Sequence, residues 1–295
     1  MSSTLTLAEW LAEKPFALAL SSSFFGFYAH AGAVRALHDA GLAPARVCGS
    51  SAGSVIAGLY GGGLDPASSL PELIFRIRHA DILTPFWFAP WSCLRKGGLA
   101  IINQGFLRDN APIPLLEQSK VPVSISTWCT ERRRTVVHTT GDVATVVAAS
   151  CAIPSLFQPV TVNGTVHVDG GMGDLLALAS IGQRERSLSV DLHTNGLSGP
   201  RAHLLARYDA QRRSAGALLE GTVRLQLHAV PFVGPTSMAT AGPVAYQAGR
   251  RAMSEALALS APEWGRERIV VVNAGGAAAA GAGVVDSAAG GASLS

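Results

Sequence analysis

The segment CGSSAGS, residues 48–54, decides the fold class expected for this sequence. It joins PARVCG, which has the pattern of a strand, to SAGSVIAGLYGGG, which has the pattern of a helix ending near Gly61. Upstream, the apolar run FALAL (residues 16–20) is typical of a strand buried on both faces, and AHAGAVRALHDAG is typical of a helix that ends at Gly41. Strand, helix, strand, helix predicts an α/β fold with a mostly parallel central sheet flanked by helices.

The same segment contains a candidate nucleophile. Residues 49–53, GSSAG, fit the pattern G-x-S-x-G at a strand-to-helix turn. Only Ser51 has glycine two positions away on both sides, Gly49 and Gly53, so it is the serine that such a turn pushes out of the sheet. The start of the following helix would offer free N–H groups to a developing oxyanion. The alternative is a glycine-rich turn without chemistry.

A serine hydroxyl needs a base within hydrogen-bond reach. Asp169 is the candidate, because it ends the hairpin PVTVNGTVHVDGG, whose turn is Asn163-Gly164, and is followed by Gly170 and Gly171. A carboxylate at a strand end can be aimed at the end of a neighbouring strand, although Asp-Gly is also a common turn. None of the downstream histidines sits in a distinctive turn motif; they include His138, His167, His193, His203 and His228.

Several ordered motifs together resemble the patatin-like acyl hydrolases. That family combines a G-x-S-x-G turn with a D-G-G/A loop, and here GSSAG is followed 118 residues later by DGG. The segment ASCAIPSLFQPV before the hairpin and the helix AHAGAVRALHDAGL are also similar to the family. The resemblance is good over residues 16–174 and weak beyond them.

The resemblance implies a three-layer α/β domain that hydrolyses acyl esters in lipids, phospholipids or other acyl glycerolipids, through an acyl-enzyme. It implies Ser51 as nucleophile and Asp169 as general base, with no metal and no cofactor. Asp169 would need a pKa low enough to leave it ionised.

One element departs from the family pattern. A glycine-rich loop usually follows the first strand and supplies backbone N–H groups to the oxyanion, and this chain has SSSFFG at residues 21–26. A backbone donor does not depend on its side chain, provided that φ is negative at a non-glycine residue. The candidate donors are Ser22, Ser23, Phe24, Phe25 and Gly26, together with Ala52. Two alternatives stay open: a lipid-binding protein without activity, and a Ser-His-Asp esterase using His193 or His228.

Composition bounds the remaining possibilities. Of 295 residues 48% are hydrophobic and 15% charged, and the net charge is only +3, so a large core is expected and a nucleic-acid surface is not. We expect one domain over residues 1–272 and a disordered Ala/Gly-rich tail over residues 273–295. Gly61 to Gly63 follow a helix and lack the Lys-Ser/Thr continuation, so no nucleotide loop is predicted.

The sequence also gives expectations about the cellular compartment and about one aromatic segment. The N-terminus lacks the basic region of a signal peptide and no membrane-spanning run is found, so a cytoplasmic protein is expected, with contact at membranes or lipid droplets left open. Cys48, Cys93, Cys129 and Cys151 are expected to be reduced thiols. The run ILTPFWFAPWSCL carries Phe86, Trp87, Phe88 and Trp91, followed by Arg95 and Lys96. It predicts either a loop that dips into lipid or one folded onto the core. The oligomeric state is not predicted.

Overall fold

The computed structural model describes residues 5–85, 98–194, 219–261 and 268–275. The aromatic run from Phe86, with Cys93, and His203 lie outside these residues. The strands are β1 (Ala17–Leu20), β2 (Arg46–Ser50), β3 (Leu83–Pro85), β4 (Gly98–Ile102), β5 (Val123–Cys129), β6 (Arg134–His138), β7 (Ser155–Phe157), β8 (Val160–Val162), β9 (Thr165–Val168), β10 (Ser187–Thr194), β11 (Thr222–Val230) and β12 (Ile269–Asn273). The helices are α1 (Leu7–Ala12), α2 (Phe27–Asp39), α3 (Ala52–Gly62), α4 (Ser69–Arg76), α5 (His79–Ile82), α7 (Gly105–Asn110), α8 (Val143–Ser150) and α10 (Met238–Ala258), with short 3₁₀ turns η1 (Leu116–Gln118) and η2 (Gly170–Met172).

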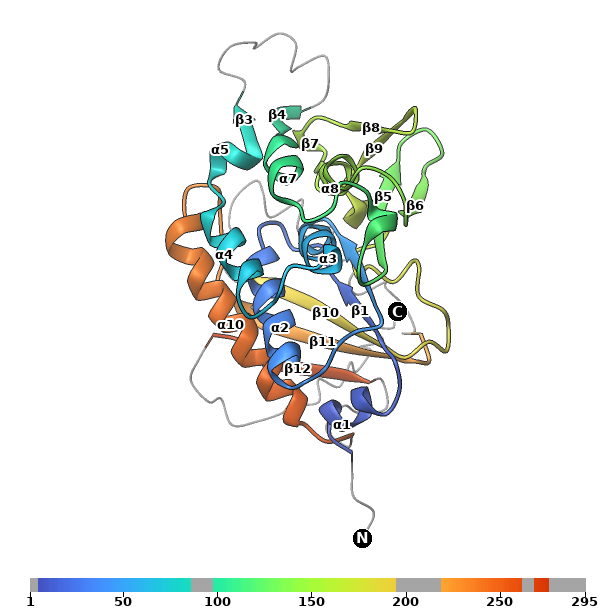
Figure 1. The fold of residues 1–295 in the computed structure, drawn as a ribbon, viewed down its shortest axis with the longest axis vertical. Helices are drawn as coiled ribbons and strands as arrows, with labels where there is room; N and C mark the ends of the chain where they lie inside the picture. The colour runs from blue at the N-terminus through green and yellow to red at the C-terminus, as the bar shows by residue number, and fades with distance from the viewer. Residues whose placement is uncertain (1–4, 86–97, 195–218, 262–267, 276–295) are drawn as a thin grey trace, which may run out of the picture.

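A mostly parallel sheet forms the centre of the molecule, as the sequence predicts (Figure 1). Its order is β12-β11-β10-β1-β2-β5-β9-β8, and every pair from β12 to β5 is parallel. β6 and β9 pair with β5 in antiparallel fashion, and β8 and β9 form the predicted hairpin. Asn163 and Gly164 both have positive φ, 49° and 79°, as a two-residue hairpin turn requires.

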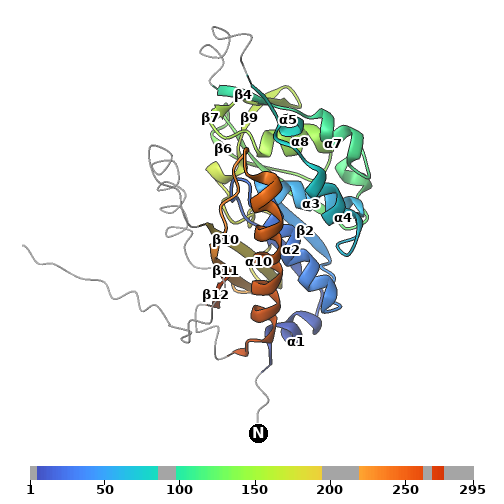
Figure 2. The same cartoon turned by 90° about the vertical axis from the view of Figure 1, so that its left-hand side faces the viewer.

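Helices α2, α3 and α10 cover one face of this sheet (Figures 1 and 2). The strand side chains on this face are large and apolar, with Leu18 and Leu20 of β1 fully buried. On the opposite face β1 and β2 present the small side chains of Ala17, Ala19 and Cys48, which pack against the segment containing Ile181. Alternation along each strand therefore separates a bulky helical interface from a tighter second face.

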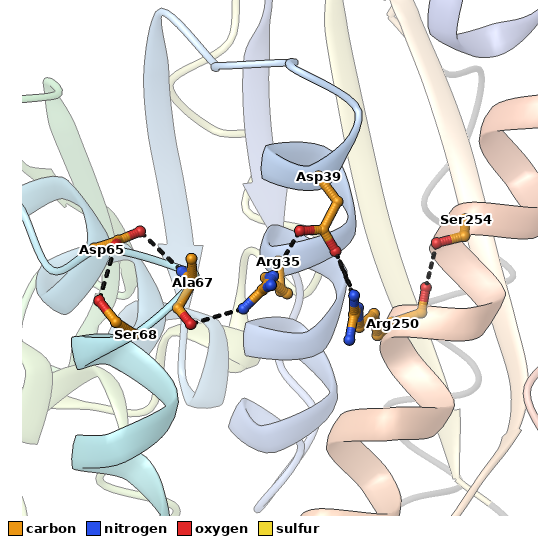
Figure 3. A network of polar contacts seen from close by, with 7 residues as sticks. All are labelled: Arg35, Asp39, Asp65, Ala67, Ser68, Arg250 and Ser254. Atoms are coloured by element: carbon orange, nitrogen blue, oxygen red, sulfur yellow. Dashed lines mark hydrogen bonds and ion pairs between the residues drawn. The ribbon is translucent and has the colours of Figure 1, made fainter.

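Close contact between α2 and α10 depends on two glycines. A Cβ on Gly32 would overlap the carbonyl oxygen of Tyr246, and a Cβ on Gly249 would overlap that of Ala29. At the rim of this contact Asp39 accepts hydrogen bonds from Arg35 at 2.7 Å and Arg250 at 3.0 Å (Figure 3). The two glycines let the backbones approach, and the ion pairs close the outer edge.

The structure differs from the sequence expectations in two places. Within residues 66–105, for which no helix is predicted above, the structure has helix α4, whose Leu70, Leu73 and Ile74 bury one face at helical spacing. The domain also extends past residue 272, because Asn273 ends β12 and Ala274, which is buried, donates its N–H to the carbonyl of His228 at 2.7 Å. The expected tail loses its first residues to the sheet because each added strand residue gains ladder hydrogen bonds; residues 276–295 lie outside the described residues.

Candidate active site

Two strands that run toward each other bring Ser51 and Asp169 together. β5 pairs with β2 up to Ser126 and with β9 from Trp128 onward. Because β6 already occupies the other edge of β5 over the same residues, β2 and β9 share one edge, end to end. One is parallel and the other antiparallel to β5, so their carboxyl ends converge opposite Thr127. Ser51 and Asp169 are the first residues after these two ends.

The turn at Ser51 is strained and tightly packed. Ser51 has φ 50° and ψ −120°, a region that non-glycine residues rarely adopt. A Cβ on Gly49 would lie 2.6 Å from the Cα of Ser54, and a Cβ on Gly53 would overlap the carbonyl oxygen of Leu20. Both flanking glycines are therefore needed for α3 to fold back on the sheet, and Ser51 projects between them.

Side chains from α3, from the last residue of α8 and from the residue that follows it hold the Ser51 peptide in this conformation. Its N–H donates to Ser150 Oγ at 2.9 Å, and Ser150 Oγ donates in turn to the Ser126 carbonyl at 2.7 Å. Its carbonyl accepts from Ser54 Oγ at 2.6 Å and from Cys151 Sγ at 3.2 Å. The backbone on both sides of the strained residue is thus hydrogen-bonded, which fixes the direction of its side chain.

Asp169 is fully buried beside Ser51. Its N–H donates to the Ala152 carbonyl at 3.0 Å, and its Oδ1 accepts the Gly171 N–H at 2.8 Å. Among the described residues Oδ2 has no partner at ordinary hydrogen-bond geometry. The Ser51 and Ser22 hydroxyls nevertheless lie close enough to influence the carboxyl group, as is common in a free enzyme, where such contacts are long or poorly aligned.

Burial controls the charge of Asp169. Desolvation raises its pKa to about 7, while the hydrogen bonds from Ser51, Gly171 and Ser22 lower it less strongly. The sequence interpretation needs a carboxylate ionised over the whole neutral range. The structure limits this to pH values above about 7, because the carboxyl group is completely removed from water.

The loop after β1 offers fewer donors than the sequence suggests. The Ser22 N–H donates to the Leu175 carbonyl at 2.8 Å and the Gly26 N–H to the Ser23 carbonyl at 2.9 Å, so these two amides are occupied. No hydrogen bond is made by the amides of Ser23, Phe24, Phe25 or Ala52 to the part of the chain that the structure describes. The serines keep negative φ, whereas Phe24 takes the left-handed conformation with φ 56°.

An apolar pocket opens beside Ser51. Four aromatic rings line it, those of Phe24, Phe25, Phe27 and Phe157. The other side chains lining it are Ser51, Ala52, Val55, Ile82, Cys151 and Ile153. None carries a charge, so the pocket suits a hydrocarbon group better than a polar one.

The histidines considered as alternative bases are engaged elsewhere. His193 Nε2 lies 2.9 Å from Asp191 Oδ2, and His228 Nε2 lies 3.2 Å from Gln226 Oε1; the two rings stack with centroids 4.3 Å apart. His138 and His167 both bond to Thr127 Oγ1 at 2.8 Å. None of these hydrogen bonds or ring contacts involves Ser51, and among the described residues no group of His, Cys, Asp and Glu is placed to hold a metal ion.

Sequence reasoning missed several residues that shape the site. Ser150 and Cys151 lie in ASCAIPSLF, the segment similar to the family, but no pattern in it points to a bond with the Ser51 peptide. The sequence suggests Ser22 for its amide, whereas its hydroxyl is the group that faces Asp169. Contacts of this kind join residues about 100 positions apart and become visible only in three dimensions.

A family model described as patatin-like phospholipase matches residues 18–178. The chain belongs to this family. The match spans β1, the turn at Ser51, α8 and the loop at Asp169. The match leaves out helix α1, strands β10 to β12 and helix α10.

The chain is also similar in sequence to curated proteins from mycobacteria. An uncharacterized NTE family protein of Mycobacterium bovis, Mb1092c, is 28% identical over 181 residues, which are 61% of this chain and 49% of the relative. Another from Mycobacterium tuberculosis, Rv2565, is 28% identical over 167 residues, 56% of this chain and 28% of the relative. The chain thus spans half or less of the length of these curated relatives.

Two solved structures are similar. VipD from Legionella pneumophila aligns with a TM-score of 0.49 and 14% identity, over 87% of this chain and 71% of that chain. The type III effector protein ExoU aligns with a TM-score of 0.36 and 17% identity, over 82% of this chain and 53% of that chain. Among the described residues of the present protein, no helix combines the length and apolarity needed to cross a bilayer.

Proposed function

We propose that this protein hydrolyses acyl ester bonds of lipids through a Ser51-Asp169 dyad and an acyl-enzyme intermediate. The observation that carries the proposal is the strained Ser51 placed beside a fully buried carboxyl group at an apolar pocket. Membership of the patatin-like phospholipase family supports the choice of a lipid ester as substrate.

The chemistry follows from the groups present. Ionised Asp169 takes the proton of Ser51 as Oγ attacks the ester carbonyl carbon and forms the tetrahedral intermediate. The N–H of Ala52 and a free amide of the loop at Ser23, Phe24 and Phe25 would stabilise the oxyanion. Collapse breaks the bond to the alcohol oxygen, which receives the proton from Asp169 and leaves. Water then attacks the acyl-enzyme with Asp169 again as base, which releases the acid and restores Ser51.

The geometry supports a dyad over a Ser-His-Asp triad. A triad requires a histidine between serine and carboxylate, within hydrogen-bond reach of both. Here the carboxyl group of Asp169 is itself next to Ser51, and His193 is bonded to Asp191. We therefore assign the base to Asp169 and no catalytic role to His193 or His228.

A fluorophosphonate probe tests the proposal without knowledge of the natural lipid. We expect covalent labelling at Ser51, lost in Ser51→Ala together with hydrolysis of p-nitrophenyl esters. Ser50→Ala is the matched control, because Ser50 is the adjacent buried serine and its Oγ makes no hydrogen bond with the described residues. Labelling that persists in Ser51→Ala would contradict the assignment.

A second candidate is a lipid-binding protein that has lost catalysis. The occupied amides of Ser22 and Gly26 favour it, since loss of one oxyanion donor typically costs about 2.7–4 kcal/mol of transition-state stabilisation. Fatty-acid binding and probe labelling together distinguish the two functions. A binding protein retains fatty acids without reacting with the probe, whereas an enzyme does both.

A further inference from the structure

Phe24, in the loop after β1, has a backbone conformation that a bulky residue rarely adopts. Its φ of 56° places a bulky side chain in the left-handed region, where such residues are rare. Strain of this kind persists only when surrounding contacts over-determine it, and it often marks a functional position. The contacts of the ring therefore indicate what the conformation is for.

The ring of Phe24 is held from two sides. It stacks on Phe232, which follows β11, with centroids 6.0 Å apart and planes 16° from parallel. It also meets the edge of Phe25, with centroids 4.8 Å apart and planes at 75°. Phe25 is buried and Phe24 is partly buried, so the two rings form a supported aromatic wall in the loop that follows β1.

This wall forms part of the lining of the pocket beside Ser51. Phe24 packs against the main core and also against the small cluster containing Ile153 and Phe157. Both Phe24 and Phe157 line the pocket. An acyl chain attached to Ser51 and lying in this pocket would therefore meet the Phe24 ring as it lengthens.

We propose that Phe24 sets the length of the acyl chain that the pocket accepts, so that the preferred substrates are esters of short and medium-length acyl groups. The inference rests on the proposed function for the reacting ester. It adds the acyl specificity of this chain and the residue responsible. Phe232 acts as a positioning residue, because it supports the Phe24 ring and does not line the pocket.

The test compares p-nitrophenyl esters with acyl chains from butanoate to hexadecanoate. Phe24→Ala and Phe24→Gly should raise kcat/KM for long chains relative to short ones by about tenfold or more, the usual scale for one or more methylenes in an apolar pocket. Phe24→Trp should shift the preference toward shorter chains. The glycine variant suits φ 56° and guards against loss of folding. Phe75→Ala, which removes an aromatic ring that is 41% exposed and outside the pocket, should leave the preference unchanged.

Binding provides a readout that does not depend on turnover. In the Ser51→Ala background, calorimetry with saturated fatty acids should show weaker binding beyond medium length, and an added Phe24→Ala should remove that limit. If Ser51-dependent hydrolysis occurs but neither Phe24→Ala nor Phe24→Gly changes the chain-length profile, the inference is wrong and the proposed function stands. If hydrolysis is absent but fatty-acid binding depends on Phe24, the proposed function is wrong and the pocket assignment holds. Fatty-acid binding that is indifferent to Phe24 overturns the inference in either case.

Discussion

At the scale of single residues, Asp169 combines two opposing demands. The desolvation that places its carboxyl group next to Ser51 also raises its pKa to about 7. A base must be ionised to accept a proton, so kcat/KM should rise with pH and level off above about 7. A pH profile measured with a soluble ester checks this. A profile flat between pH 5 and 8 would contradict Asp169 as the base.

The same shift makes a prediction about stability. A raised pKa in the folded state means that the folded protein binds a proton more tightly than the unfolded chain, so the contribution is fully present below about pH 4 and is lost as pH rises to about 7. Asp169→Asn should abolish catalysis and remove this dependence. Urea unfolding at pH 5.5 and 8.5 should therefore show a smaller loss of stability with rising pH in Asp169→Asn than in the wild-type protein. An equal loss would mean that Asp169 titrates normally.

Ser150 tests whether the strained turn needs its supports. Ser150→Ala removes the partner of the Ser51 N–H and leaves buried polar groups unsatisfied, which typically costs about 1–3 kcal/mol. We expect kcat to fall because Ser51 loses its fixed direction. Ser119→Ala is the control, since Ser119 Oγ also donates to a backbone carbonyl, that of Leu116, far from the site. If both variants keep full kcat, the support is structural only.

At the scale of elements, the packing of α2 against α10 makes glycine more favourable than alanine at one helical position. Glycine to alanine inside a helix usually stabilises by about 1 kcal/mol. Gly249→Ala should instead destabilise, by about 1–3 kcal/mol, because the new Cβ overlaps the Ala29 carbonyl oxygen. In Gly58→Ala of α3 the new Cβ meets only the side chains of Val143 and Val147, at 3.3 and 3.5 Å, so the change should be small. Chemical denaturation of both variants measures the two changes in the free energy of unfolding.

At the scale of the whole molecule, one hydrophobic core joins the two ends of the described chain. The main cluster includes Leu7 of α1 and Ala274 beyond β12, so no boundary divides it. We expect a single cooperative unfolding transition, with coincident curves from tryptophan fluorescence and far-ultraviolet circular dichroism. Two separated transitions would contradict the single domain expected from the sequence.

Local sequence patterns by themselves determined the fold class and the family of this protein. Apolar runs, helix stops at glycine and the Asn163-Gly164 turn act over a few residues, so β1, α2, β2, α3 and the β8–β9 hairpin could be predicted. The turn motif also singled out Ser51, because the steric demand for Gly49 and Gly53 is itself local.

Only the tertiary structure decided how the site is assembled. The meeting of β2 and β9 along one edge of β5, the bond from Ser51 to Ser150, and the burial that raises the pKa of Asp169 all depend on residues far apart in the chain. The availability of an amide in the loop after β1 is decided in the same way, because it depends on whether a distant carbonyl, such as that of Leu175, has already taken it. Burial and hydrogen bonding are properties of the packed chain, and a short segment cannot specify them.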